Sequence, residues 1–267
     1  MRIHSLKLAY FSPTGTSAAV AKAVARGLYC DNVETFDITM PDARRQPLRA
    51  SANDLLLIAV PVYGGRVPLF LEPWLRGLQL DRTPVICVVV YGNRAYEDAL
   101  IELTDIVSER GGVVVGAAAF IGEHSFSNAE YPVAVARPDV DDLRLAEDLG
   151  RRVREAVDSY ASTDAAPGLA IPGDRPYKER KPRGPVDFIL VGDECTQCGV
   201  CAEHCPVGAI PEGEFGCTDP DKCIMCCACI KVCPENARSM MDSTKMVEIS
   251  QWLADNCQER KEPEWYL

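Results

Sequence analysis

The chain has 267 residues and a formal net charge of −11, and hydrophobic residues make up 47% of it. This composition is typical of a globular protein of about two domains, and the excess of negative charge argues against nucleic acid as a partner. No apolar run approaches the ~20 residues of a membrane span, and no basic and apolar signal segment begins the sequence, so we expect a cytoplasmic protein outside the membrane.

The first 160 residues alternate predicted strands and helices. Short apolar or β-branched runs occupy 3–11, 33–38, 54–62, 84–91 and 113–121, and helix-length segments occupy 16–28, 95–110 and 139–160. Continuous apolar strands separated by helices are typical of a parallel sheet that is covered on both faces. We therefore expect an α/β fold with a doubly wound, five-stranded parallel sheet in the order 2-1-3-4-5.

The turn after the first predicted strand has the composition of a phosphate-binding loop. It reads SPTGTS over residues 12–17 and leads straight into an apolar helix. Hydroxyl side chains, a glycine and a helix N-terminus together favour a bound monophosphate. An ordinary helix cap is the alternative, because Ser and Thr are favoured there anyway. The loop has no lysine and no G-x-G-x-x-G follows any strand, so the sequence supports neither a Walker loop nor a Rossmann dinucleotide site.

Residues 161–187 are rich in proline and glycine and contain a basic run from Arg175 to Arg183. This composition predicts an extended linker that its prolines make semi-rigid. Two placements of the basic run remain open. It lies against the acidic segment that follows, or it is simply solvated.

Two cysteine runs of one design follow the linker. Each reads C-x2-C-x2-C-x3-C-P, the spacing by which bacterial ferredoxins hold 4Fe-4S clusters, and the fourth cysteine of each run ligates the other cluster. We therefore expect two clusters. One is assigned to Cys195, Cys198, Cys201 and Cys233, and the other to Cys223, Cys226, Cys229 and Cys205.

Structural zinc and a disulfide framework are the alternatives for these cysteines. Zinc sites use pairs of C-x2-C with a long gap between them, and disulfides need an oxidising compartment, so neither fits as well. Cys227 and Cys217 fall outside the spacing and are not expected to be ligands. Cys30, Cys87 and Cys257 have apolar neighbours and are expected to be buried.

Negative charge is concentrated around the clusters. Residues 188–267 contain 14 acidic and 6 basic side chains, which accounts for −8 of the net charge. We expect this field to favour a redox protein with a basic docking patch, although acidity that serves only solubility is the alternative. Farther on, Met246, Ile249, Leu253 and Cys257 share one stripe of a predicted helix that can dock onto another part of the chain.

Several segments together resemble the flavodoxin and ferredoxin fusion proteins of anaerobic bacteria and archaea. YFSPTGTS at 10–17 resembles the phosphate loop of flavodoxins, which bind FMN. PVYGGRVP at 61–68, YGNRAYEDAL at 91–100, GEHSFS at 122–127 and NCQERKEPEWYL at 256–267 also match. The resemblance implies a flavodoxin-like FMN-binding domain at 1–160, the linker at 161–187, a bacterial-type two-cluster ferredoxin domain at 188–241, and a C-terminal helix and tail at 242–267.

The resemblance also implies which residues hold FMN. The phosphate is expected at Ser12, Thr14, Gly15, Thr16 and Ser17. One wall beside the isoalloxazine ring is expected to comprise Pro61, Val62, Tyr63, Gly64 and Gly65, and the other Gly92, Asn93, Arg94 and Tyr96. His124 follows the fifth strand, where a flavin-edge or proton-relay role and a plain surface position both remain open.

Both ring loops depart from ordinary flavodoxins. The 60s loop lacks the tryptophan often found there, and Trp74 is expected in a helix core instead. Arg66 either helps the flavin or is solvated. Asn93 and Arg94 stand where acidic residues are common, so we expect a more positive field around the flavin.

The cofactors together indicate electron transfer. Flavin exchanges one or two electrons and each cluster exchanges one, so we expect a carrier that passes electrons between two 4Fe-4S clusters and FMN. A ferredoxin-type donor or an oxidoreductase acceptor is the expected partner, and no catalytic residue is assigned. A flavin enzyme acting on a quinone or nitro compound is one alternative, and a redox sensor or assembly partner is another.

Overall fold

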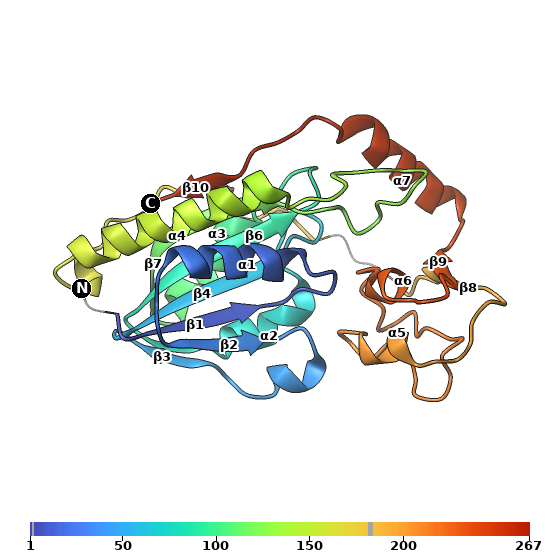
Figure 1. Ribbon diagram of the computed structural model, residues 1–267, viewed down its shortest axis with the longest axis horizontal. Coiled ribbons are helices and arrows are strands. Elements are labelled where there is room, and N and C mark those ends of the chain that lie inside the picture. The colour runs from blue at the N-terminus through green and yellow to red at the C-terminus, as the bar shows by residue number, and fades with distance from the viewer. Residues whose placement is uncertain (2, 181–183) are drawn as a thin grey trace.

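A parallel sheet forms the centre of the molecule (Figure 1). The computed structural model describes residues 1, 3–180 and 184–267. Five strands, β1 (Ser5–Tyr10), β2 (Val33–Asp37), β4 (Asp54–Pro61), β6 (Thr83–Tyr91) and β7 (Gly112–Ile121), pair in parallel in the order β2-β1-β4-β6-β7. The predicted order 2-1-3-4-5 is therefore confirmed. A sixth strand that was not predicted, β10 (Glu264–Tyr266), pairs antiparallel with β7.

Helices cover both faces of this sheet. One face packs against α1 (Thr16–Gly27) and α4 (Val140–Ser159), and the other against α2 (Glu72–Arg76) and α3 (Ala99–Glu109). Every residue of β6 is buried, as expected for a central strand between two layers. The predicted helix at 95–110 begins later, at Ala99, because Asn93 and Glu97 have left-handed backbone angles (φ 60° and 44°) that interrupt a right-handed helix.

Shorter elements connect the main ones: η1 (Pro41–Arg44), η2 (Leu69–Leu71), η3 (Thr163–Ala165) and the paired strands β3 (Arg49–Ser51) and β5 (Gln79–Asp81). Trp74 in α2 is 5% exposed and its indole N–H donates to the carbonyl of Gln46, so its predicted core position is confirmed. Cys87 and Cys257 are buried as expected. The expectation for Cys30 is wrong, because this residue beyond the end of α1 is partly exposed.

The linker is bound to α3 and the loop before it. Three ion pairs hold it there: Arg175 with Asp105 (2.6 Å), Lys178 with Glu97 (2.5 Å) and Arg180 with Glu102 (2.6 Å). Both expected placements are wrong for these three basic residues, since their partners belong to the first 160 residues and not to the cysteine segment or to solvent. Lys181 to Arg183 lie outside the described residues.

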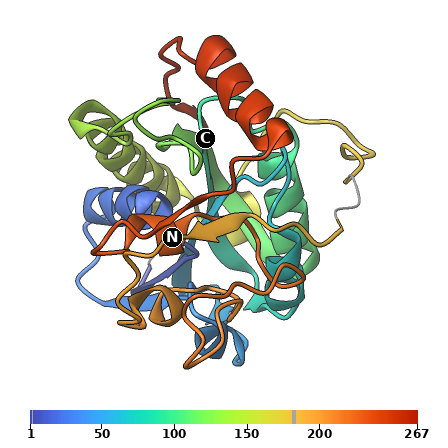
Figure 2. The ribbon, with the colours of Figure 1, turned by 90° about the vertical axis from the view of Figure 1, so that its right-hand side faces the viewer.

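The segment with the cysteine runs has two similar halves. In each half a loop leads into a one-turn helix, α5 (Val200–Glu203) in the first half and α6 (Ala228–Lys231) in the second. The strands at the two ends of the segment, β8 (Ile189–Val191) and β9 (Arg238–Met240), pair antiparallel. Gly199 and Cys227 precede these helices with left-handed φ angles of 83° and 61°. Cys227 therefore takes the backbone role that Gly199 has in the first half. The segment lies beyond the carboxyl ends of the parallel strands (Figures 1 and 2).

A final helix, α7 (Thr244–Asn256), leads from the cysteine segment back towards β10 (Figure 1). Met246 packs into the core of the cysteine segment, whereas Leu253 and Cys257 pack with Val133, and Ile249 contacts both groups. The predicted docking stripe is thus confirmed. In the part of the chain that the structure describes, no helix is both long enough and apolar enough to span a bilayer.

Candidate functional site

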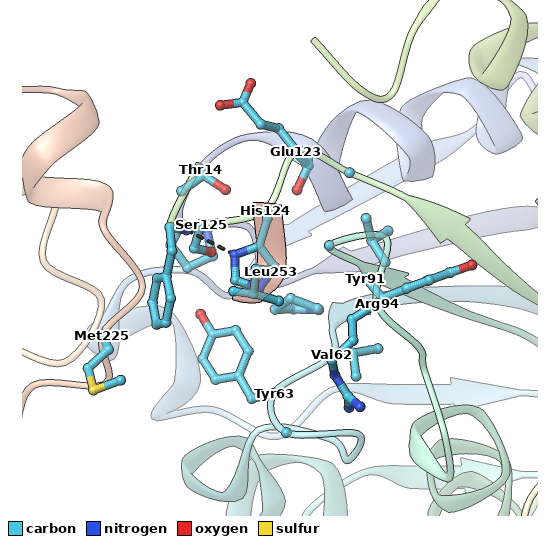
Figure 3. Close-up of a pocket in the computed structure, with 18 of the residues that line it drawn as sticks. Thr14, Val62, Tyr63, Tyr91, Arg94, Glu123, His124, Ser125, Met225 and Leu253 are labelled. Carbon is cyan, nitrogen blue, oxygen red and sulfur yellow. Dashed lines mark hydrogen bonds between the residues drawn. The ribbon is translucent and has the colours of Figure 1, made fainter. Parts of the chain in front are cut away.

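A cavity of about 630 Å³ opens where the parallel strands end. Its walls come from the loops after β1, β4, β6 and β7, which is the edge where ligands bind in doubly wound sheets. Two further walls come from distant parts of the chain, namely the second cysteine run and α7. Figure 3 shows side chains from these loops, among them Thr14, Tyr63 and His124, directed towards one space.

The structure brings ten of the fifteen residues implied for FMN to this cavity. They are Thr14, Thr16, Ser17, Pro61, Val62, Tyr63, Gly64, Gly92, Arg94 and His124. The remaining five, Ser12, Gly15, Gly65, Asn93 and Tyr96, do not line it. Asn93 Nδ2 instead donates to the carbonyls of Cys257 and Glu259 at 2.8 Å each. The Tyr96 hydroxyl donates to Glu264, so both side chains hold the C-terminal tail.

Some lining residues were missed by the sequence analysis. Pro13, Glu123, Ser125 and Phe126 lie inside or beside the motifs that resemble flavodoxins, and could have been included on that ground. Ile224 and Met225 from the second cysteine run and Glu248, Ile249, Trp252 and Leu253 from α7 also line the cavity. The predicted docking stripe includes Ile249 and Leu253, but nothing local in the sequence places any of the six at this cavity, because only the packing of remote segments brings them there.

The first turn fits a phosphate group. Gly15 has φ 87° and lets the chain turn into α1. Ser12 Oγ accepts a hydrogen bond from the N–H of Ala18 in the first turn of α1 at 2.9 Å, although Gly15 occupies the N-cap position itself. Ser17 is 1% exposed, and its Oγ has no hydrogen-bond partner among the described residues. A buried polar group without a hydrogen-bond partner lowers the stability of the folded protein by about 1–3 kcal/mol. An anion bound at the helix N-terminus would accept a hydrogen bond from this hydroxyl and remove that penalty.

His124 is packed closely against the loop after β6. A Cβ added at Gly92 would lie 2.3 Å from Cδ2 of His124, so only glycine allows this approach. Nδ1 of His124 accepts the N–H of Phe126 at 3.1 Å, which places the proton of the neutral ring on Nε2. Burial, helped by Arg94 and Lys231, lowers the pKa of His124 to about 4. The ring is therefore neutral at pH 7.

We expect the free energy of unfolding of the flavin-free protein to fall less steeply with decreasing pH in His124→Gln than in the wild type. The pKa of His124 is about 4 in the native state, below the ~6.5 of an unfolded histidine. Between these two pH values the unfolded state binds more protons than the native state. The free energy of unfolding therefore falls as the pH is lowered from about 6.5 to about 4. The shift corresponds to at most ~3 kcal/mol. Urea unfolding of both proteins between pH 7 and 4 measures it, and parallel pH profiles would contradict it.

The field around the cavity is not as positive as expected. Arg94 lines the cavity, but Glu97 neutralises it at 2.9 Å. Two carboxylates, Glu123 and Glu248, also line the cavity, and Glu123 pairs with Lys231. Arg66 does not line it, since its guanidinium binds Glu102 at 2.7 Å and supports the 60s loop from the side of α3.

The eight cysteines of the two runs surround two further hollows. Cys195, Cys198, Cys201 and Cys233 line the first, and Cys205, Cys223, Cys226 and Cys229 line the second. These are the two groupings expected from the spacing. Within the described ranges, no three His, Cys, Asp or Glu side chains converge on a point that could hold a single metal ion. Cysteines spread around a hollow suit a cube of iron and sulfur better than a zinc ion.

Backbone amides point at the cysteine sulfurs. The N–H of Ala209 donates to Sγ of Cys205 at 3.2 Å, and the N–H of Ala237 donates to Sγ of Cys233 at 3.3 Å. Such hydrogen bonds stabilise thiolate charge and tune a cluster. Cys227 also lines the second hollow, but its Sγ donates to the carbonyl of Met225 at 3.8 Å.

Comparison with known proteins identifies the cysteine segment. The 4Fe-4S binding domain family, Fer4, matches residues 189–210 and 217–239. The chain joins a flavodoxin-like fold to a 4Fe-4S ferredoxin domain. A ferredoxin from Megasphaera elsdenii is 60% identical over 25 residues, which are 9% of this chain and 46% of that protein. The chain thus spans less than half of the length of this curated relative.

Solved flavodoxins are similar to the first part of the chain. An archaeal flavodoxin has 16% identity and a TM-score of 0.41, covering 58% of this chain and 99% of its own. The two-electron reduced flavodoxin of Megasphaera elsdenii has 19% identity and a TM-score of 0.39, covering 56% and 98%. The Fusobacterium nucleatum flavodoxin bound to flavin mononucleotide has 16% identity and a TM-score of 0.38, covering 58% and 96%. The flavodoxin-like assignment rests on the strand order described above.

The ferredoxin domain lies directly against the large cavity. Ile224 lines both this cavity and the second cysteine hollow, so the two spaces share a wall. Figure 3 shows Met225 approaching the cavity from the side of the ferredoxin domain. Two polar contacts fix the junction: Arg44 donates to the carbonyl of Pro206 at 2.5 Å, and Lys231 pairs with Glu123 at 2.9 Å.

Proposed function

We propose that this protein transfers electrons between two 4Fe-4S clusters and an FMN bound in the large cavity, linking a low-potential donor to a redox partner. The observation that carries the proposal is the shared wall at Ile224, because it joins the cavity proposed for FMN to the hollow proposed for one cluster. When bound, FMN exchanges one or two electrons and each cluster exchanges one.

The residues have distinct roles in this proposal. Cys195, Cys198, Cys201 and Cys233 hold one cluster, and Cys205, Cys223, Cys226 and Cys229 hold the other. Ser17 and the N-terminus of α1 bind the phosphate, which anchors the flavin so that its ring lies between the loops after β4 and β6. His124 and Phe126 close the side next to β7 and exclude water. The neutral Nε2–H of His124 is available as a hydrogen-bond donor within the cavity.

The two cluster sites differ in their surroundings. The site with Cys226 adjoins the cavity, whereas the site with Cys198 includes an exposed cysteine. Exposed carboxylates lie close in sequence to the latter cysteines, at Asp193, Glu194, Glu203 and Glu235. We infer that electrons cross between the protein and its partner at the Cys198 site, and that the partner presents a basic patch.

The proposal implies a division of the chain. Residues 1–160 bind FMN, 161–187 link, 188–241 hold both clusters, and 242–267 return to the first domain through α7 and β10. It also assigns the protein to the cytoplasm, where cysteine ligands stay reduced.

A flavin enzyme for a small quinone or nitro compound is the second candidate. The wall of the cavity formed by Phe126, Ile249 and Leu253 favours it, because apolar side chains there suit a flat organic molecule as well as the flavin itself. In that case the clusters would supply the electrons that the substrate receives.

A comparison of electron donors tests the carrier proposal. Reduced ferredoxin or dithionite should reduce clusters and flavin rapidly, and NADH or NADPH alone slowly or not at all, because the sequence has no dinucleotide fingerprint. Stopped-flow mixing with each donor, followed at flavin wavelengths, makes the measurement. Rapid bleaching by a nicotinamide alone would support an oxidoreductase instead, and rapid reoxidation by a quinone in steady turnover would support the second candidate.

A further inference from the structure

The helix α7 presents one face to the large cavity. Glu248, Ile249, Trp252 and Leu253 line it, and residues four apart in a helix lie on the same side. Leu253 is only 4% exposed and belongs to the core beneath the helix. Trp252 is 52% exposed although it is the largest apolar side chain on this face, so it contributes little to the core.

The position of Trp252 is fixed from both ends of the helix. At the first turn of α7, Met246 is buried in the core of the ferredoxin domain. Just beyond its last turn, the side chain of Asn93 donates to the carbonyls of Cys257 and Glu259. The tail then pairs with β7 through β10. The helix α7 is therefore attached to the ferredoxin domain at its start and to the flavodoxin-like domain at its end, and these attachments fix the position of Trp252 at the cavity.

The loop after β4 offers the cavity a single aromatic side chain, that of Tyr63. Residues 61–68 contain Tyr63 but no tryptophan, and the buried Trp74 lies away from the cavity lining. A flavin ring is flat and aromatic, so it gains from a second ring packed against it. Trp252 provides a half-exposed indole at a wall of the same cavity.

We propose that Trp252 packs against the isoalloxazine ring of FMN, so that the C-terminal helix completes the flavin site. This inference rests on the proposed function, because it requires FMN in the cavity. A half-exposed indole does not by itself indicate a function, since isolated apolar side chains are common on protein surfaces. Its place at the cavity wall, on a helix held at both ends, distinguishes this one.

Flavin affinity provides the first test. FMN is titrated into full-length protein with its clusters intact and its flavin removed. Trp252→Ala should weaken binding at least about fivefold, as expected when a stacked ring is lost, while Trp252→Phe should keep most of the affinity. Gln251→Ala is the matched control, because Gln251 is an exposed neighbour on α7 that does not line the cavity. Its affinity should equal that of the wild type.

Tryptophan emission provides the second test and remains valid if the alanine variant folds poorly. The chain has three tryptophans, and Trp74 and Trp265 lie outside the cavity lining. FMN should quench the emission of the wild type and of Trp265→Phe, and quench that of Trp252→Phe much less. Unchanged quenching and affinity in the Trp252 variants would overturn the inference and leave the proposed function intact. Failure of FMN to bind the wild type would overturn the proposed function itself.

Discussion

Replacing Cys226 with serine is expected to remove the proposed cluster whose hollow shares a wall with the large cavity. The anaerobically purified wild type should contain about eight iron atoms per chain, and Cys226→Ser about four. Cys226 lines the second hollow together with Cys205, Cys223 and Cys229, and serine is a poor ligand in place of a thiolate. Iron and sulfide analysis, together with the EPR spectrum of the reduced protein, measures the loss.

Two matched variants make this result specific. Cys227→Ser and Cys217→Ser should keep about eight iron atoms, because both cysteines fall outside the ligand spacing. Cys227 is the demanding control, since its sulfur lies beside the same hollow but is directed to the carbonyl of Met225. If Cys227→Ser lost as much iron as Cys226→Ser, the assignment of ligands in the second run would be wrong.

The second large effect is expected at Ser17. Ser17→Ala should weaken FMN binding about 10- to 150-fold, the range for a hydrogen bond to a charged group. The same change should not destabilise the flavin-free protein. Oγ of Ser17 is buried there without a hydrogen-bond partner, so replacing it with a methyl group removes a desolvated polar atom and breaks no hydrogen bond. Titration with FMN and chemical denaturation without it measure the two halves of this prediction.

Ser12→Ala is the contrasting variant in the same turn. Its hydroxyl accepts the N–H of Ala18, so its loss should lower the stability of the flavin-free protein by about 1 kcal/mol, the usual contribution of one intramolecular hydrogen bond. A Ser17 variant that bound FMN as tightly as the wild type would mean that the phosphate lies elsewhere. Loss of stability in the Ser17 variant alone would mean that this hydroxyl is structural.

Local sequence patterns predict much of the architecture, namely the grouping of the cysteines and the order of the strands. Cysteine spacing predicts both groupings around the hollows, because ligands of a cluster must follow each other at short intervals on a tight turn. Continuous apolar strands such as β6 predict a parallel sheet covered on both faces, and the alternation of five such strands with helices predicts their order. The carboxyl edge of that sheet then locates most of the residues that line the cavity.

What the sequence could not predict depends on packing between distant segments. Asn93 and Tyr96 stand in a loop that was expected to bind the flavin, yet their side chains bind the tail, which is remote in sequence. The strand β10 is too short to carry a periodic pattern of its own, and it forms because the edge of β7 is available. The basic linker residues pair with carboxylates near α3 because these lie closest in space, which composition alone does not reveal.

The pairing of β10 with β7 also bears on how the protein is made. On the ribosome, β7 is complete long before the segment that covers its edge, and both cysteine runs are synthesised in between. During that interval β7 presents unpaired backbone groups to which another chain can add. Since α7 precedes β10, the wall that this helix contributes to the cavity is also absent until the same late stage. Both cysteine runs are therefore synthesised before the segments that cover the edge of β7 and complete the wall of the cavity.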